Sequence, residues 1–405
     1  MKKSKELKLI VTYIIVLLMI VDSNSIFMTG TASSLLSKAI MLLMTMAVCV
    51  LISRVRLSSR DYQNYTVSIL VIFMYLLIYI VITNLWLGKG DLKSSLIIFI
   101  KFLLMYTIVA LVYKKEKNPQ ILIAYSNLVC IIAVISIFFW IFGSQLQLIH
   151  PTGVYMSNWS NLYGGYDSKA TYYNIYFETQ WLDNVVRNSA IFAEAPMASL
   201  TFSVAITLEN LYGKECKFHK LKLLILILAV LTTFSSTGYI CLIINLVYLL
   251  LKNRSKKSNF LLVLVPVILI VGVLGINYIF SNKLQTSSGI SRSVDYMNAF
   301  TAWEKYPFLG IGINNGSKLL YGIGKFGYSN SFGKILGEGG IYLTLLYIYP
   351  FIVSLWRAYN MKSLRQLFLT IIVVFLFITT IFTNTYLLYF LLSFLALWKP
   401  KQDSN

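Results

Sequence analysis

Charged side chains are scarce in this sequence. They make up 12% of the residues, whereas soluble domains contain about 25%, and 15 acidic residues stand against 35 basic ones. So low a charge content excludes an ordinary soluble domain. The sequence is instead 58% hydrophobic, and apolar stretches long enough to cross a bilayer as a helix follow one another along it.

Histidine and cysteine are also rare, and each scarcity excludes a kind of site. The two histidines, His150 and His219, fall on opposite sides of the membrane in the topology that the basic residues indicate, which excludes a histidine-rich metal site. A site built from carboxylates alone is not expected either, so we predict no metal. Three of the four cysteines fall inside predicted spans and Cys216 lies at a cytoplasmic edge, so no outer-loop disulfide is expected.

The apolar stretches predict an all-α integral membrane protein with about twelve transmembrane helices. The net charge of +20 does not indicate a nucleic-acid partner, because Lys and Arg cluster in alternate loops, as the positive-inside rule describes for cytoplasmic loops. Both termini are therefore expected in the cytoplasm, with residues 1–405 forming a single polytopic membrane domain. The predicted spans are 7–21, 34–53, 65–86, 94–113, 121–143, 196–212, 220–234, 237–251, 260–280, 332–356, 367–381 and 383–398.

Two loops are long, residues 144–195 and 281–331, and both are expected outside the cytoplasm. The first is rich in Tyr and Trp, Tyr173 and Trp181 among them, beside polar residues such as Asp183. Aromatic faces next to carboxylates and amides suit a sugar, whose C–H face packs on a ring while its hydroxyls need hydrogen-bond partners. An aromatic belt at the membrane interface explains the same residues about equally well.

The stretch RNSAIFAEAP ends at Pro196, which marks the expected start of the sixth span, because proline fits the first turn of a helix. Ile191 and Phe192 are expected to dip into the membrane surface. Arg187 and Glu194 then remain at the outer polar boundary, near a helix N-terminus whose N–H groups and dipole favour an anion. A phosphate group at the membrane surface is the predicted ligand.

The second long loop contains SRSVDYMNAFTAWEKYPFLGIGINNG. Apolar residues recur in it every three positions, which predicts an amphipathic surface helix over 292–305, with Ser291 as N-cap and Pro307 as stop. Arg292 would lie in the first turn, where its charge and the helix dipole together suit a bound anion; an arginine that snorkels to lipid headgroups is the alternative. The apolar positions are Val294, Met297, Phe300 and Trp303.

The glycines of Gly310-Ile311-Gly312 do not indicate a dinucleotide site, because no strand precedes them and the loop faces away from the cytoplasm. A tight turn that presents backbone N–H groups to phosphate stays open. The favoured role is a bend that carries the chain from the surface helix towards the tenth span.

The stretch SNSFGKILGEGG follows at the entrance of that span. Asn330 or Ser331 is expected to cap the helix, and Lys334 and Glu338 form an i,i+4 pair. An acidic group this far into a span is costly, so Glu338 is expected to face the lysine or a polar cavity. Structural pairing is favoured over a direct catalytic role.

These three stretches resemble segments of the O-antigen polymerase and ligase superfamily of bacterial membrane glycosyltransferases, the Wzy-like proteins. RNSAIFAEAP is similar to an arginine-led segment at a span entrance, and the second stretch to an Arg, a Trp and then Pro-x-x-Gly-x-Gly. SNSFGKILGEGG is similar to a segment of His-Asn, apolar residues, Glu and Gly that opens a late span. One departure matters: Ser329 stands where many members, ligases especially, have histidine, which weakens a ligase assignment.

The resemblance implies a polymerase of lipid-linked oligosaccharide repeat units at the outer face of the bacterial cytoplasmic membrane. Such an enzyme transfers the growing glycan of O-antigen, capsule or exopolysaccharide from undecaprenyl diphosphate to the next repeat unit. It uses no nucleotide sugar and no metal, so no cofactor is expected. Its expected partners are the undecaprenyl-diphosphate-linked oligosaccharide, the lipid bilayer, a chain-length regulator and a flippase.

For this reaction we expect Arg187 and Arg292 to hold the diphosphate and stabilise the charge that grows on it as the glycosidic bond breaks. Glu194 is the candidate proton acceptor, with Asp183 or Asp295 as alternatives. The residues expected to bind substrate are Asp183, Asp295, Trp303, Asn330, Glu338, Tyr173 and Trp181.

Two alternatives remain. A repeat-unit flippase would also have about twelve spans, but it would need polar residues around a central cavity and would not need two long outer loops. The spans here carry few interior charges, mainly Lys38, Lys101 and Glu338, and we find no internal repeat. An O-antigen ligase-like glycosyltransferase is the second alternative, and the serine at position 329 argues against it.

Overall fold

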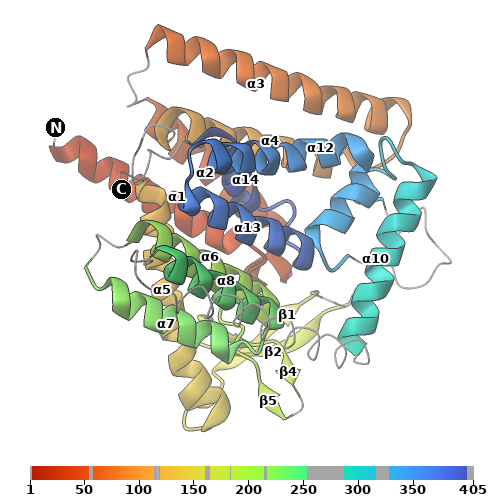
Figure 1. Cartoon of the computed structure of the whole chain (residues 1–405). Coiled ribbons are helices and arrows are strands. Elements are labelled where there is room, and N and C mark those ends of the chain that lie inside the picture. Colours follow the sequence, from red (N-terminus) through yellow and green to blue (C-terminus); the bar gives the residue numbers. More distant parts are fainter. Residues whose placement is uncertain are drawn as a thin grey trace. The chain divides into compact units, whose positions relative to one another are not determined.

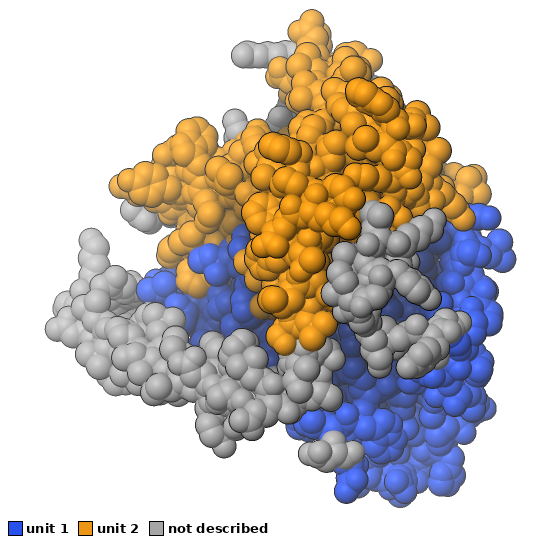
Figure 2. Space-filling view, turned by 90° about the vertical axis from the view of Figure 1, so that its right-hand side faces the viewer, with its two compact units in different colours: residues 1–40, 118–283, 371–376 blue, residues 41–117, 284–370, 377–405 orange. Residues whose placement is uncertain are grey.

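The computed structural model describes residues 2–53, 58–113, 116, 119–159, 165–182, 184–213, 217–252, 287–315 and 328–398. These residues are mostly helical, as Figure 1 shows. The chain divides into two compact units, coloured blue and orange in Figure 2, and each unit is built from segments far apart in the sequence. Unit 1 comprises residues 1–40, 118–283 and 371–376, and unit 2 comprises residues 41–117, 284–370 and 377–405.

Unit 1 is a helical bundle centred on α6 (Ala195–Tyr212). The other helices are α1 (Lys2–Asp22), α5 (Gln120–Phe139) with the π-helical turn η4 (Trp140–Gln145), α7 (His219–Thr232) and α8 (Ser236–Lys252). α6 packs against α5, α7 and α8, and α5 also packs against α1. Every α6 residue from Met197 onwards is buried, because its many Ala, Ser and Thr side chains let neighbouring helices approach closely.

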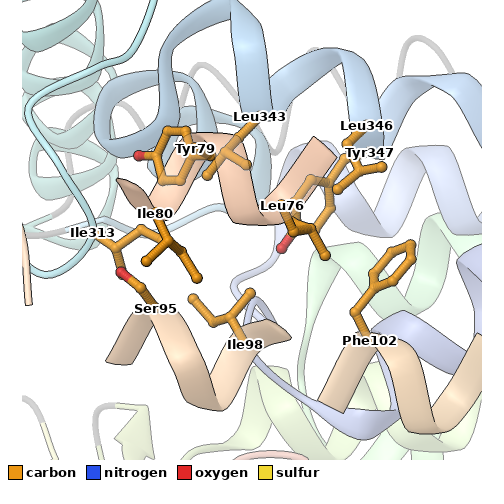
Figure 3. A pocket seen from close by; sticks show the side chains of 10 residues that line it. All are labelled: Leu76, Tyr79, Ile80, Ser95, Ile98, Phe102, Ile313, Leu343, Leu346 and Tyr347. Carbon is orange, nitrogen blue, oxygen red and sulfur yellow. The ribbon is translucent and has the colours of Figure 1, made fainter. Parts of the chain in front are cut away.

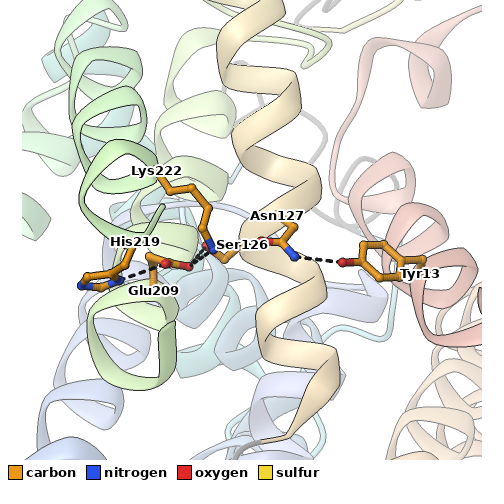
Figure 4. A network of polar contacts seen from close by, with 6 residues as sticks. All are labelled: Tyr13, Ser126, Asn127, Glu209, His219 and Lys222. Carbon is orange, nitrogen blue, oxygen red and sulfur yellow. Dashed lines mark hydrogen bonds and ion pairs between the residues drawn. The ribbon is translucent and has the colours of Figure 1, made fainter. Parts of the chain in front are cut away.

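A buried carboxylate, Glu209 of α6, ties this bundle together (Figure 4). Three side chains contact its oxygens: Ser126 Oγ at 2.7 Å, His219 Nδ1 at 2.9 Å and Lys222 Nζ at 3.0 Å. Lys222 also donates to Asn127 at 3.0 Å, and Asn127 donates to the hydroxyl of Tyr13 at 2.8 Å. The network therefore links α1, α5, α6 and α7.

The loop before α6 folds into two small antiparallel sheets, which the all-α prediction did not include. β1 (Gly153–Ser157), β2 (Asp167–Tyr172) and β3 (Tyr176–Glu178) pair in that order, and β4 (Trp181–Leu182) pairs with β5 (Val185–Val186). Between β2 and β3, Tyr173 and Asn174 have φ angles of 52° and 55°, the left-handed conformation that a tight hairpin turn requires. The sheets hold the residues before Pro196 in a defined conformation.

Unit 2 contains the remaining described helices; α2 and α13 contribute residues to both units. They are α2 (Ser33–Ile52), α3 (Ser59–Ile80) with η2 (Val81–Trp86), α4 (Leu92–Ile108) with η3 (Val109–Tyr113), α10 (Ser287–Lys305), α12 (Ser331–Asn360), α13 (Leu364–Thr379) and α14 (Tyr386–Leu397). α10 packs along α12, and α14 packs against both α4 and α12. These contacts bring the second long loop against the tenth predicted span.

The helices agree with a multi-pass α-helical membrane protein. Every predicted span that falls on described residues contains a helix, and the predicted span 260–280 lies outside those residues. Within the described part of the chain, five helices are long and apolar enough to cross a membrane: Ser33–Ile52, Asp61–Trp86, Leu92–Tyr113, Gln120–Gln145 and Ser331–Asn360. The count of twelve spans and the cytoplasmic placement of the termini remain predictions.

Candidate functional site

The Arg187 side chain lies across the turn that follows α7 in unit 1. Its Nε donates to the carbonyl oxygen of Thr233 at 2.9 Å, and its Nη2 donates to that of Phe234 at 3.2 Å. Carbonyl oxygens at a helix C-terminus lack intrahelical partners and carry the negative end of the helix dipole, so they attract a cation. These two bonds hold the half-buried guanidinium in a fixed orientation.

Gln180 joins Arg187 to Glu194. Its Oε1 accepts hydrogen bonds from Arg187 Nη1 and from the backbone N–H of Ala195, both at 3.2 Å, and its Nε2 donates to Glu194 Oε2 at 2.9 Å. Glu194 occupies the N-cap position of α6 but makes no capping hydrogen bond, so the Gln180 amide caps the helix instead. The structure therefore brings together the two charged residues of RNSAIFAEAP.

Sequence reasoning did not assign Gln180 to this cluster. Gln180 and Arg187 flank the β4–β5 hairpin, and the backbone N–H of Arg187 donates to the Gln180 carbonyl oxygen at 3.0 Å. The hairpin thus places the two side chains next to each other. Strands of two residues leave no periodic signal in a sequence, so only the turn-forming Asp183-Asn184 pair pointed to it.

The entry to α6 confirms one prediction and corrects another. The helix begins at Ala195, and Pro196 lies in its first turn, as predicted. Phe192 does not dip into a membrane surface: its side chain is fully buried in unit 1, and its backbone forms a bridge with Ser25. Pairing with the segment that follows α1 draws this residue inward.

The aromatic residues of the first loop divide into a buried set and an exposed set. Tyr172 and Tyr176 are buried, and the Tyr172 hydroxyl donates to Glu178 at 2.8 Å. Burial, assisted by the Glu178 carboxylate, raises the pKa of both phenols above their ordinary value. Tyr173 and Trp181 are 64% and 60% exposed and remain candidates for a sugar-binding surface, whereas Asp183 lies outside the described residues.

In unit 2, α10 begins earlier than predicted. The helix starts at Ser287, so Ser291 is not its N-cap, and Arg292 does not lie in its first turn. The argument that the α10 dipole and Arg292 act on one anion is therefore wrong. The helix ends at Lys305, before Pro307, and its apolar residues Val294, Met297 and Phe300 are exposed, as expected for an amphipathic surface helix.

α12 is interrupted at Gly340, and the interruption is filled by the segment after α10. Gly340 has φ 59° and ψ −164°, which breaks the helical hydrogen-bond ladder. The N–H groups of Ile341 and Tyr342 donate to the carbonyl oxygens of Pro307 and Phe308 at 2.9 and 3.0 Å. In return, the N–H groups of Ile311 and Gly312 donate to the carbonyl oxygens of Gly337 and Glu338 at 3.0 and 2.9 Å.

This pairing explains the glycines of the Pro-x-x-Gly-x-Gly stretch. Gly310 has a φ of +68° and lies so close to the backbone of Glu338 that a Cβ would overlap it. Gly312 has a φ of +92°, and a Cβ there would meet the backbone N of Gly90 at 2.6 Å. The glycines therefore allow a close backbone-to-backbone contact, rather than only the bend that the sequence suggested.

Several buried polar side chains lie at the N-terminus of α12. Asn330 caps the helix as predicted, with its Oδ1 accepting from the backbone N–H of Gly333 at 2.6 Å. Asn330 is 1% exposed, yet its Nδ2 has no hydrogen-bond partner among the described residues, and neither has the buried Nε1 of Trp303 on α10. Ser329, just before the cap, lies close enough to Asp295 on α10 to lower the pKa of that carboxyl, although the buried Ser329 Oγ has no hydrogen-bond partner among the described residues.

The charged residues near this end of α12 have different environments. Burial raises the pKa of Asp295, while Ser329 and the positive charge of Arg292 lower it in part. Arg292 and Asp295 are thus neighbours one turn apart on α10. Glu338 is 6% exposed and lies one turn after Lys334 on α12, and the pairing of these two side chains remains a prediction.

The one pocket described in unit 2 is apolar (Figure 3). It lies between α3, α4 and α12, next to the Ile313 backbone, and the side chains that line it are mostly Leu, Ile and aromatic. Ser95 and the hydroxyls of Tyr79 and Tyr347 are its only polar side-chain groups. This lining does not suit a glycan, so we place the candidate site at the α10–α12 contact instead.

Residues 221–348 match the family model described as O-antigen ligase. The match supports the O-antigen polymerase and ligase superfamily that the sequence resembles. It includes the α10 stretch and the start of α12, with Arg292, Asp295, Asn330 and Glu338, whereas RNSAIFAEAP lies before it. No curated protein matches the chain.

Proposed function

We propose that this membrane protein of the O-antigen polymerase and ligase superfamily is a polymerase of lipid-linked oligosaccharide repeat units. It transfers the growing glycan from undecaprenyl diphosphate to the next repeat unit at the outer face of the bacterial cytoplasmic membrane. The observation that carries the proposal is the group of Arg292, Asp295, Trp303 and Asn330 on α10 and α12, within the segment that matches the family. It offers a cation, a carboxylate and two buried hydrogen-bond donors along the α10–α12 contact.

The proposed roles of the arginines follow from the charge that the reaction creates. The leaving diphosphate gains a negative charge as its bond to the sugar breaks, and a cation fixed in advance stabilises that charge without reorganising. Arg187 is fixed by the carbonyl oxygens of Thr233 and Phe234 and by Gln180. Arg292 supplies positive charge beside Asp295 in unit 2.

The exposed rings of Tyr173 and Trp181 are proposed to contact the glycan, since flat aromatic faces pack against sugar C–H groups. The polymerase is further proposed to act after a flippase has delivered the repeat unit and together with a chain-length regulator. Glu338 is assigned a supporting role, because it is buried beside Lys334 and its carbonyl oxygen accepts from Gly312.

A polymerase is favoured over the two alternatives. A ligase of this superfamily would be expected to carry histidine where this chain has Ser329. A flippase needs a polar cavity and would not need the two long loops of this chain.

The proposal is tested by the size distribution of the surface polysaccharide in cells that carry Arg187→Ala or Arg292→Ala. Each variant is expected to reduce long glycan to single repeat units that still reach the outer face, because transfer loses an electrostatic contribution of about 10²–10³ in rate. Lys305→Ala, which removes an exposed cation from the same helix as Arg292, is the matched control and should leave the distribution unchanged. Accumulation of repeats in the inner leaflet would instead indicate a flippase.

A further inference from the structure

Asp295 lies where three features of unit 2 meet. It is half-buried on α10, Arg292 lies one turn before it, and Ser329 approaches it from the segment that leads into α12. Tyr328, next to Ser329, is the other titratable group that feels its charge, and Glu338 acts on that tyrosine in turn. Asp295 thus lies on the helix that packs along α12.

Two buried donors along the α10–α12 contact, Asn330 Nδ2 and Trp303 Nε1, have no partner among the described residues. Leaving a buried N–H group unpaired costs about 1–3 kcal/mol, so such a group in a folded protein calls for an explanation. The Nδ2 of Asn330 and the Nε1 of Trp303 are both donors, and a ligand that satisfies them must present lone pairs. Sugar hydroxyl and ring oxygens present lone pairs, and the indole face of Trp303 suits the sugar C–H groups.

The Asp295 carboxylate indicates which part of the substrate binds at the α10–α12 contact. A diphosphate would be repelled by Asp295, whereas a sugar hydroxyl can donate its hydrogen to the carboxylate and accept from Asn330 or Trp303. Such a set of one acceptor and two donors fits an acceptor sugar, with Asp295 at the attacking hydroxyl and Trp303, about two helical turns further along α10, at another part of the sugar. Asp295, Asn330 and Trp303 are therefore better suited to the acceptor sugar, whereas Arg292 keeps the role at the leaving diphosphate proposed above.

We propose that Asp295 is the proton acceptor of the transfer, and that Asn330 and Trp303 bind the acceptor sugar that carries the attacking hydroxyl. This inference rests on the proposed function. It also assigns Glu194 a positioning role, because Glu194 holds Gln180, and Gln180 holds Arg187.

The chemical step balances without a further reactant. The acceptor hydroxyl oxygen forms a bond to the anomeric carbon of the donor glycan, and the bond from that carbon to the carrier phosphate oxygen breaks. The electron pair of the broken bond stays on the diphosphate, and the hydroxyl proton passes to the Asp295 carboxylate. The products are the extended glycan, undecaprenyl diphosphate and a protonated Asp295, which returns its proton to water.

The position of Ser329 fits this assignment. Serine cannot accept a proton at neutral pH, so the chain needs another base where the superfamily often has histidine. A histidine introduced at 329 would lie near the side chain at position 295, because Ser329 is close enough to influence the Asp295 carboxyl. Burial also raises the pKa of Asp295, which brings its basicity closer to that required of a general base.

The test is a chain-extension assay with membranes that contain the full-length protein. Lipid-linked repeat units extracted from cells that lack the protein serve as both donor and acceptor, and product length is measured on gels. Asp295→Asn is expected to lower the extension rate at least about 100-fold, the size of a lost general base. Glu304→Gln, which neutralises an exposed carboxylate on the same helix, is the control and should stay within about twofold of the unmodified protein.

A rescue variant separates a catalytic role from a structural one. Ser329→His in the Asp295→Asn background should restore the rate at least about tenfold. The acid limb of its pH profile should move towards the ordinary pKa of histidine, about 6.5. The unmodified protein should lose activity as the pH falls through a value above the ordinary pKa of aspartic acid, about 3.9, because the base must be ionised to act.

The outcomes distinguish the assignment of Asp295 as proton acceptor from the proposed polymerase function. If the unmodified protein extends the glycan and Asp295→Asn does so within about tenfold of it, the assignment of Asp295 is overturned while the polymerase stands. If Asp295→Asn does not accumulate in the membrane, the pH profile of the unmodified protein decides, and the absence of an acid limb above about pH 4 overturns the assignment. If the unmodified protein extends nothing, both proposals fail.

Discussion

The orientation of the Arg187 side chain is fixed by its hydrogen-bond partners. Its guanidinium donates to two carbonyl oxygens and to the Gln180 amide, so its direction is set before any substrate arrives. A fixed cation stabilises developing charge at lower cost than one that must be ordered during the reaction. The same three bonds would also serve stability, so charge and geometry must be separated by experiment.

Arg187→Lys makes that separation. Lysine keeps the positive charge but lacks the planar fork that donates to Thr233, Phe234 and Gln180 at once. We expect chain extension to fall at least about tenfold, since each hydrogen bond lost to a charged group is worth about 1.5–3 kcal/mol. Lys305→Arg, an exposed exchange of the same kind on α10, should have no effect; full activity of Arg187→Lys would show that orientation is irrelevant.

Gly310 is required by a close approach between backbones. Gly310→Ala would place a Cβ against the Glu338 carbonyl group in a residue with φ +68°, whereas Gly88→Ala meets nothing within 4 Å at φ +62°. The left-handed conformation alone costs about 1–2 kcal/mol, so Gly88→Ala should lower the free energy of unfolding by that amount and Gly310→Ala by more. Thermal unfolding in detergent measures both, and equal losses would contradict the close contact.

Single residues were predicted from the sequence where their role is local. Pro196 at the start of α6 and Asn330 as the cap of α12 follow from preferences that act within one helical turn. Gln180 was not predicted as the partner of Arg187, because a two-strand hairpin sets their proximity. The environment of Phe192 was predicted wrongly, because it depends on contact with the segment after α1, which is distant in the sequence.

At the scale of elements, α10 shows where a periodic pattern is insufficient. The exposed stripe of Val294, Met297 and Phe300 predicted a surface helix, and the helix is there. Its start was misjudged, because Ser287–Ser291 carries a glycine and serines that suggest a turn, and the helix nevertheless extends through them. The role proposed for Arg292 therefore cannot rest on the α10 dipole.

The hydrogen bonds around Glu209 connect helices of unit 1 and support their packing. Glu209→Gln would leave Lys222, whose side chain is 13% exposed, without its counter-charge. Breaking a buried pair on one side costs about 3–5 kcal/mol, so we expect a marked fall in the midpoint of thermal unfolding. The double variant Glu209→Gln with Lys222→Met removes both charges and should be less damaging; a double variant as unstable as the single one would contradict the pairing.

The interruption of α12 could not be predicted from sequence. Gly337, Gly339 and Gly340 signalled weak helix formation, but the partner that fills the break is the Pro307–Gly312 segment, about thirty residues earlier. The Pro307–Gly312 segment and the interrupted part of α12 thus form one hydrogen-bonded feature, although they belong to two separate motifs in the sequence. That feature holds α10 beside the start of α12, where the acceptor sugar is proposed to bind.

At the scale of the whole molecule, composition predicted the membrane class and the helical segments, because hydrocarbon requires helices of a certain length. The division into two units could not be predicted, since each unit combines segments separated by more than a hundred residues. Arg187 and Glu194 belong to unit 1, and Arg292, Asp295 and Asn330 belong to unit 2.

The most direct test of the central claim is the stoichiometry of the purified protein in liposomes, supplied only with undecaprenyl-diphosphate-linked repeat units. A polymerase should release one undecaprenyl diphosphate for each repeat unit added and leave a longer glycan on the lipid, without nucleotide sugar or added metal. Repeat units that cross the bilayer at unchanged length and with no diphosphate carrier released would contradict the account.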